Sequence, residues 1–170
     1  MASLIETLID VLDKENTEYE GLLDLSKDKT SAIVHGDVDK LQELLGHEQK
    51  YIDRINALED KRQQNVKDIC NVLNLSEKGM KIDMIIEMLN KQPKEHDALQ
   101  EVHLKLKRTL NQLTRINDNN KVLLKESMDM IEFEMNLVKN SVVAPQTGNY
   151  SKGAYEQVNM AGTGCFDAKQ

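Results

Sequence analysis

The stretch SAIVHGDVDKLQELLGHEQ, Ser31 to Gln49, decides how this chain folds, because it interrupts helical periodicity with a single Gly-Asp pair. A Gly such as Gly36 tolerates the left-handed conformation found at helix C-termini. An Asp such as Asp37 accepts hydrogen bonds from the free N–H groups of a new first turn. The stretch therefore predicts two helices joined by a tight turn, with Gly36 present for backbone conformation rather than for ligand contact.

Apolar residues recur at three- and four-residue steps on both sides of this turn. Before it they predict a helix over about residues 2–34, with a candidate capping box at Ser3 and Glu6. The apolar positions after the turn alternate strictly by three and four, with some seam positions charged: Val38, Leu41, Leu45, Ile52, Ile55, Val66, Ile69 and Leu73. This heptad register predicts coiled-coil packing of helices on the order of 50 Å long, at ~1.5 Å per residue.

Two more helices are predicted after Leu73. Residues 74–79 break the pattern, and MKIDMIIEMLNK, Met80–Lys91, predicts a short apolar helix with three Met residues on one face. We expect this face to plug the end of a bundle, with partner binding as the alternative, because Met packs adaptably in either role. The last helix is predicted over about residues 94–140, with an apolar stripe too wide for a two-stranded seam.

From Ser141 the composition shifts to Gly, Ser, Thr, Asn and Gln, and helical periodicity stops. This predicts a disordered tail over residues 141–170. Because the tail holds Tyr150, Tyr155 and Phe166, we expect it to fold onto a partner, with an inert tail as the alternative. The chain as a whole predicts an all-α fold: an elongated antiparallel three-helix bundle or coiled coil over residues 1–140, with a short connecting helix and a flexible C-terminal tail.

Composition narrows the classes of partner. The net charge of -7 argues against nucleic acid and against an anionic membrane surface, both of which select for basic patches. The sequence shows neither a signal peptide nor an 18-residue apolar run, so we expect no direct membrane insertion. Cys70 and Cys165 lie far apart without a pairing pattern, which suits a reducing cytoplasm.

The sequence offers little for catalysis. Its His residues, His35, His47, His96 and His103, lack the spacing of metal ligands on a shared helix face. A helical metal–carboxylate enzyme would need Glu-x-x-His pairs facing a bundle interior, and the chain has none at that spacing near these His residues. No Gly-rich phosphate loop follows a strand. We therefore expect no catalytic, metal-binding or cofactor-binding residues, and a protein that is not an enzyme.

A resemblance to a known family is carried by three stretches. The first, YEGLLDLSKDKTSAIVHGDVDKLQELLGHEQKYIDRINALEDKR (Tyr19–Arg62), resembles the N-terminal half of the FlgN-type flagellar export chaperones, with their K..AIV.GD...L..L...EQ pattern. The second, RINDNNKVLLKESMDMIEFEMNLV (Arg115–Val138), is similar to the family's N-x-x-N-x-x-L-L-x-x-S stretch. Its matching residues are Asn117, Asn120, Leu123, Leu124 and Ser127. In the third, NYSKG, Tyr150 and Gly153 resemble the family's C-terminal Tyr-x-x-Gly signature.

The resemblance implies a cytoplasmic chaperone of the flagellar type III export system that uses no ATP. Such proteins hold hook-filament junction (hook-associated) subunits after synthesis and bring them to the flagellar export machinery. A long apolar-striped helix could sequester the terminal segments of those clients in a helix-in-groove mode. A function from another class stays open, that of a structural coiled-coil adaptor that self-associates and has no secreted client.

The expected client site combines the last helix with the tail. Leu123, Leu124 and Ile131 would form its apolar floor, and Tyr150 would act as a mobile anchor. Two Asn residues of the family stretch, Asn117 and Asn120, interrupt the apolar stripe. They either set the register of the bundle or mark a groove reserved for a client helix, and the resemblance favours the groove.

Overall fold

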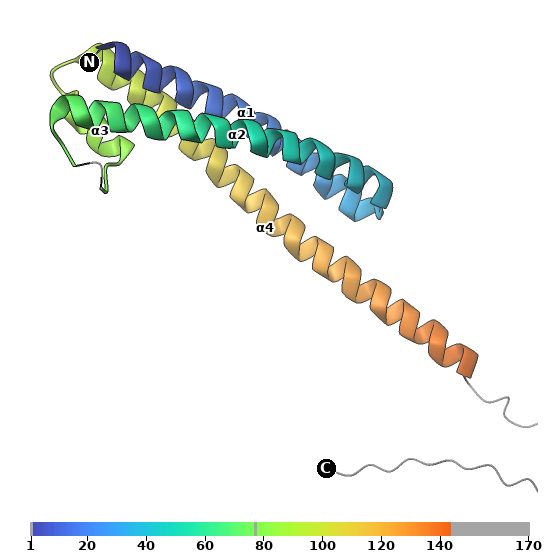
Figure 1. Ribbon diagram of the computed structural model, residues 1–170. Helices are drawn as coiled ribbons and strands as arrows, with labels where there is room; N and C mark the ends of the chain where they lie inside the picture. Colours follow the sequence, from blue (N-terminus) through green and yellow to red (C-terminus); the bar gives the residue numbers. More distant parts are fainter. Residues whose placement is uncertain (1, 77, 144–170) are drawn as a thin grey trace, which may run out of the picture. The chain divides into compact units, whose positions relative to one another are not determined.

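The computed structural model describes residues 2–76 and 78–143, and the regular secondary structure of these residues consists of helices joined by short turns (Figure 1). The helices are α1 (Ala2–His35), α2 (Val38–Leu73), α3 (Ile82–Met88) and α4 (Pro93–Val143). The predicted all-α fold of three long helices and a short connecting helix is therefore confirmed. The last helix continues past its predicted end at residue 140. Residues 144–170, most of the predicted tail, lie outside the described residues.

The turn between α1 and α2 has the predicted geometry. Gly36 adopts a left-handed φ of 65°, and a Cβ added there would meet no atom within 4 Å. The N–H of Gly36 donates to the carbonyl of Ile33 at 3.1 Å, and that of Asp37 donates to Ala32 at 2.9 Å. The Asp37 side chain in turn accepts from the N–H of Lys40 at 2.9 Å. Since Gly36 has free space around it, its backbone conformation is what calls for glycine.

Contacts between distant side chains fix the directions of the three long helices within residues 1–133, one of the two units into which the chain divides. Ion pairs from Lys29 to Glu48 and from Glu15 to Arg62 show that α1 and α2 are antiparallel. The hydrogen bonds from Thr109 to Asn16 and from Asn120 to Ser26, both 2.8 Å long, show that α1 and α4 run parallel. Consequently the bundle has the predicted up-down-up order, as Figure 1 shows.

The core consists of two hydrophobic clusters. One lies where α3 closes the bundle and is formed by Ile5, Leu8, Leu12, Ile69, Ile85, Ile86, Leu89, Leu99 and Leu106. The other lies nearer the α1–α2 turn and is formed by Leu22, Leu23, Leu25, Ala32, Leu44, Ile55 and Leu113. Leucine and isoleucine dominate both clusters, which agrees with a chain so poor in aromatic residues.

The predicted seam of α2 is wrong at three positions. Val38, Leu45 and Ile52 are exposed rather than buried. The residues that face the other helices instead are Leu44, which is buried, and Tyr51, which is half-buried and packs on the second cluster. Leu44 and Tyr51 each precede a predicted seam residue by one position, so α2 is rotated relative to the simple heptad pattern.

On this rotated face, α1 and α2 approach closely at Gly21. A Cβ on Gly21 would lie only 2.5 Å from Cε1 of Tyr51, so the tyrosine ring occupies the space that the missing side chain leaves. Arg54 covers the same ring, with its guanidinium carbon 4.6 Å from the ring centroid. Its Nε also donates to Glu18 at 2.8 Å. The absence of a side chain at Gly21 therefore gives the Tyr51 ring room on the side of α2 that faces the bundle.

The short helix α3 starts later and ends earlier than the sequence predicts. Lys81 precedes it in extended conformation, so Met80 lies outside the helix and packs on the first cluster. Ile85 and Ile86 supply the buried face, while Met84 and Met88 are exposed. The prediction that the Met face plugs the bundle is thus wrong for Met84 and Met88, and isoleucines have that role instead.

Candidate partner-binding surface

The apolar stripe of α4 is buried along the first part of the helix. Leu99, Leu106 and Leu113, spaced seven residues apart, are all buried. The first two pack in the cluster formed with α1, α2 and α3, and Leu113 packs in the cluster formed with α1 and α2. The next step of seven reaches Asn120, which is only 6% exposed. This heptad spacing is the one expected of a helix that packs along a bundle over several turns.

Asn120 joins α4 to the last turns of α1. Its Nδ2 donates to the carbonyl of Ser26 at 2.8 Å, and its Oδ1 accepts from the Thr30 hydroxyl at 2.6 Å. Both ends of the amide are therefore engaged within the chain, and this geometry favours the register interpretation for Asn120. Asn117 differs, because its side chain is exposed.

We expect Asn120→Ala to lower the free energy of unfolding by about 1–3 kcal/mol, since it removes two hydrogen bonds between α4 and α1, each worth about 0.5–1.5 kcal/mol. Urea unfolding followed by circular dichroism would measure the change. Asn117→Ala is the matched control and should change stability by no more than about 0.5 kcal/mol. Equal effects of the two substitutions would contradict the register role.

Beyond Asn120, α4 exposes a run of large hydrophobic side chains. Leu124, Met128 and Ile131 are 41%, 62% and 56% exposed, at spacings of four and three residues. We call these three residues the α4 apolar surface. Val122, Met130 and Phe133 are exposed on the same stretch. Contiguous exposed apolar side chains at helical spacing are typical of a surface that another molecule covers.

The residues predicted as a client site differ in their surroundings. Leu124 and Ile131 are exposed, whereas Leu123 and Ser127 are half-buried. The hydroxyl of Ser127 donates to the carbonyl of Leu123 at 2.9 Å, so this side chain is engaged within the helix. Tyr150 and Gly153 lie outside the described residues.

Sequence reasoning missed Met128, Met130 and Phe133, all of which are exposed. The four- and three-residue steps that join Leu124, Met128 and Ile131 could have identified the first of them. Residues 134–143, in the second unit, expose Met135, Leu137 and Val138.

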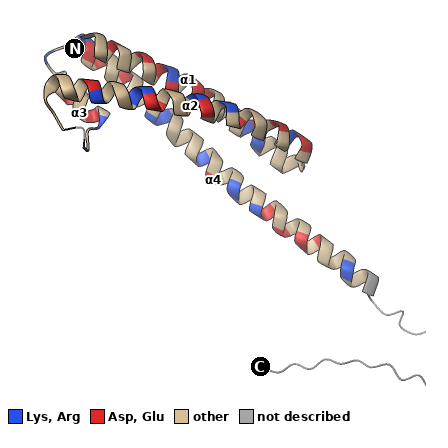
Figure 2. Ribbon diagram, in the orientation of Figure 1, with Lys and Arg blue, Asp and Glu red and all other residues tan. Residues whose placement is uncertain are grey.

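Acidic residues outnumber basic residues on the hairpin of α1 and α2. Figure 2 shows acidic and basic residues interspersed along both helices rather than gathered on a single-sign face. Between the helices, Arg62 donates to Glu15 at 3.1 Å and also pairs with Glu59. Burial raises the pKa of the Glu15 carboxyl, and the hydrogen bond from Arg62 lowers the pKa of Glu59. These charges hold α1 and α2 together and do not form a patch for nucleic acid.

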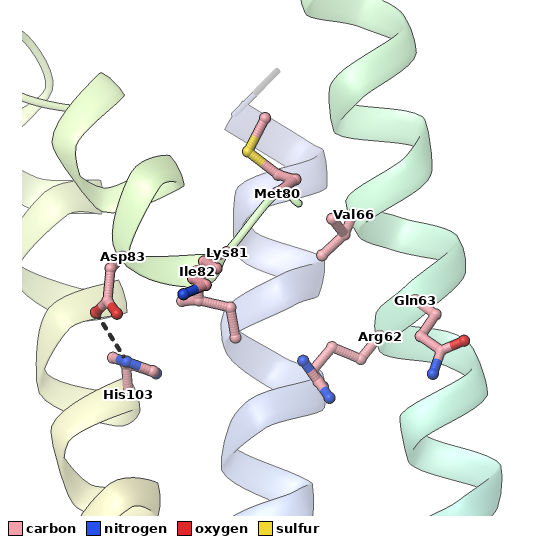
Figure 3. Close-up of a pocket in the computed structure, with 8 residues that line it drawn as sticks. All are labelled: Arg62, Gln63, Val66, Met80, Lys81, Ile82, Asp83 and His103. Carbon is pink, nitrogen blue, oxygen red and sulfur yellow. Dashed lines mark ion pairs between the residues drawn. The ribbon is translucent and has the colours of Figure 1, made fainter. Parts of the chain in front are cut away.

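A cavity of about 520 Å³ lies where α3 approaches α2 and α4 (Figure 3). Arg62 and Val66 of α2, Asp83 of α3 and His103 of α4 are among its lining residues. Nε2 of His103 lies 3.0 Å from Oδ1 of Asp83, a contact that ties α3 to α4. Within residues 2–76 and 78–143, no three His, Cys, Asp or Glu side chains come together as metal ligands would.

Comparisons with known proteins agree with the resemblance noted in the sequence. The family model described as FlgN protein matches residues 1–157, nearly the whole chain. The chain is also 29% identical over 147 residues to the protein named "Uncharacterized protein YvyG" from Bacillus subtilis (strain 168), covering 86% of each chain. No solved structure matches significantly. Among the described residues, no helix has an apolar run of the length that crossing a bilayer requires. The chain belongs to the FlgN family, the family of flagellar export chaperones.

Proposed function

We propose that this chaperone acts in the cytoplasm on hook-filament junction (hook-associated) subunits. It binds their terminal segments, prevents premature assembly, and delivers the subunits to the flagellar export machinery. The observation that supports this most directly is the α4 apolar surface, because Leu124, Met128 and Ile131 lie exposed at helical spacing on a member of a chaperone family. No step of this function requires catalysis.

The spacing of the surface fits a helical client. Side chains at steps of four and three residues form a ridge that accepts the apolar face of an amphipathic helix. Each anchor that is fully desolvated on binding contributes roughly 1.5–3 kcal/mol. A few such anchors allow binding that is specific and still reversible, as release at the export machinery requires.

The proposed client site keeps most of the residues expected from the sequence. Leu124 and Ile131 form its exposed apolar floor, half-buried Leu123 and Ser127 lie beside them, and exposed Asn117 lies upstream. Asn120 contributes by holding α4 against α1 through its two hydrogen bonds. Tyr150 and Gly153 are proposed as tail residues that close over the bound segment.

A binding experiment tests the choice of client. The purified full chain would be titrated with fluorescently labelled terminal segments of the host's junction subunits, with scrambled segments of equal composition as controls. We expect saturable binding of a junction segment, weakened by Tyr150→Ala and absent with its scrambled control. If no junction segment binds better than its scrambled control, the chaperone serves a different client.

A further inference from the structure

We infer that, in the absence of a client, the α4 apolar surface of one molecule is covered by the same surface of a second copy running antiparallel to it. The inference rests on the proposed function, because the client and the second copy would compete for one surface. Its support lies in the order of charges beside the apolar side chains.

Leu124, Met128 and Ile131 follow the alternation of a coiled-coil seam, and the sequence continues it at Met135 and Val138. In heptad notation Met128 is an a position, while Leu124 and Ile131 are d positions. Two antiparallel copies would place Met128 of each against Ile131 of the other. None of these three side chains is as buried within its own chain as Leu99, Leu106 and Leu113 are.

The flanking e positions carry charges that alternate in sign along α4. They are Asp118, Lys125, Glu132 and Lys139. In an antiparallel pair centred on the Met128–Ile131 layers, e positions face e positions. Lys125 of each copy then faces Glu132 of the other, and Asp118 faces Lys139. Every e–e contact is a pair of opposite charges.

A parallel pair would not bring these opposite charges together. There, each e position faces a g position of the other chain, and the g positions on this stretch are Asn120, Ser127 and Glu134. Asn120 is in addition buried against α1. Only Glu134 with Lys139 would make an opposite-charge contact, so the charges favour the antiparallel arrangement.

Charge reversal tests the pairing in the full chain. Lys125→Glu alone places Glu against Glu in both symmetric contacts, and Glu132→Lys alone places Lys against Lys. We expect each single variant to weaken self-association about tenfold in sedimentation equilibrium, since two exposed pairs change from attraction to repulsion. An equimolar mixture of the two variants restores both opposite-charge pairs, so it should associate about as strongly as the parent.

Asp129→Lys is the matched control. Asp129 is exposed at a b position on the same stretch, and the substitution changes net charge by the same amount as Glu132→Lys. We expect it to leave self-association nearly unchanged. Circular dichroism would verify that all variants keep the helicity of the parent, as expected for substitutions of exposed side chains.

The outcomes separate this inference from the proposed function. A parent chain that stays monomeric across the concentration series overturns the inference while leaving client binding intact. A dimer that the mixture of variants fails to restore also overturns it, because another surface then pairs. If a labelled junction segment binds and converts the dimer to one chaperone with one segment, the competition is supported; a complex that retains both copies contradicts it. Failure of the segment to bind the monomer contradicts the proposed function alone.

Discussion

Replacing Leu124 with Asp will weaken binding of a junction-subunit terminal segment about a hundredfold and leave the helical bundle intact. The side chain is 41% exposed in the free chain, so the substitution costs the fold little. On binding, the new carboxylate would lose water against an apolar client face without gaining a partner. That penalty adds to the lost apolar burial. Isothermal titration calorimetry with the full chain would measure the change.

Val122→Asp is the control for this prediction. Val122 is exposed, and two residues of helical rotation place it on nearly the opposite side of α4 from Leu124. The same change of chemistry there should alter client binding less than threefold, or about 0.6 kcal/mol. Equal losses in both variants would contradict the assignment of the client to one side of α4. Unchanged binding in Leu124→Asp would move the client site away from this surface.

Replacing Leu99 with Ala will lower the free energy of unfolding by about 2–5 kcal/mol, because the truncation leaves a cavity in the first hydrophobic cluster. Leu99 is 0% exposed and lies there among side chains of α1, α2 and α3. Urea unfolding monitored by circular dichroism would measure the loss. Client affinity should stay close to that of the parent under conditions where the variant is folded, because Leu99 is distant in sequence from the α4 apolar surface.

Leu104→Ala supplies the comparison on the same helix. Leu104 is 46% exposed, so removing its side chain should change stability by no more than about 1 kcal/mol. If the two alanine variants unfold at the same urea concentration, Leu99 is not part of a close-packed core. The pair therefore tests burial itself rather than the general cost of removing a leucine.

Local signals in the sequence were sufficient for the helices and the turn between the first two. A left-handed Gly36 and the Asp37 side-chain cap depend only on residues within a few positions of each other, and both have the predicted geometry. The start of α3 was less well predicted. Met80 fits the apolar period, yet Lys81 holds the backbone extended and delays the helix to Ile82.

The rotation of α2 could not be read from periodicity. Leu44 and Leu45 are adjacent and equally apolar, and Tyr51 and Ile52 are adjacent and both large. A pattern of threes and fours accepts either residue of each pair. On the side of α2 that faces the bundle, Gly21 of α1 makes room for the Tyr51 ring. A helix selects its buried face by the shapes of its neighbours, and those neighbours are remote in the sequence.

The sequence by itself determined the all-α class, the order of the helices, the family, and the presence of more apolar width on α4 than a hairpin needs. Only the tertiary structure decided which part of that width is covered. Asn120 is the last buried residue among the described side chains of α4. Its amide bonds to Ser26 and Thr30 of α1, and α1 ends shortly afterwards at His35. Whether an apolar side chain is core or surface depends on which helices pack beside it, and hydrophobic periodicity is the same in both cases.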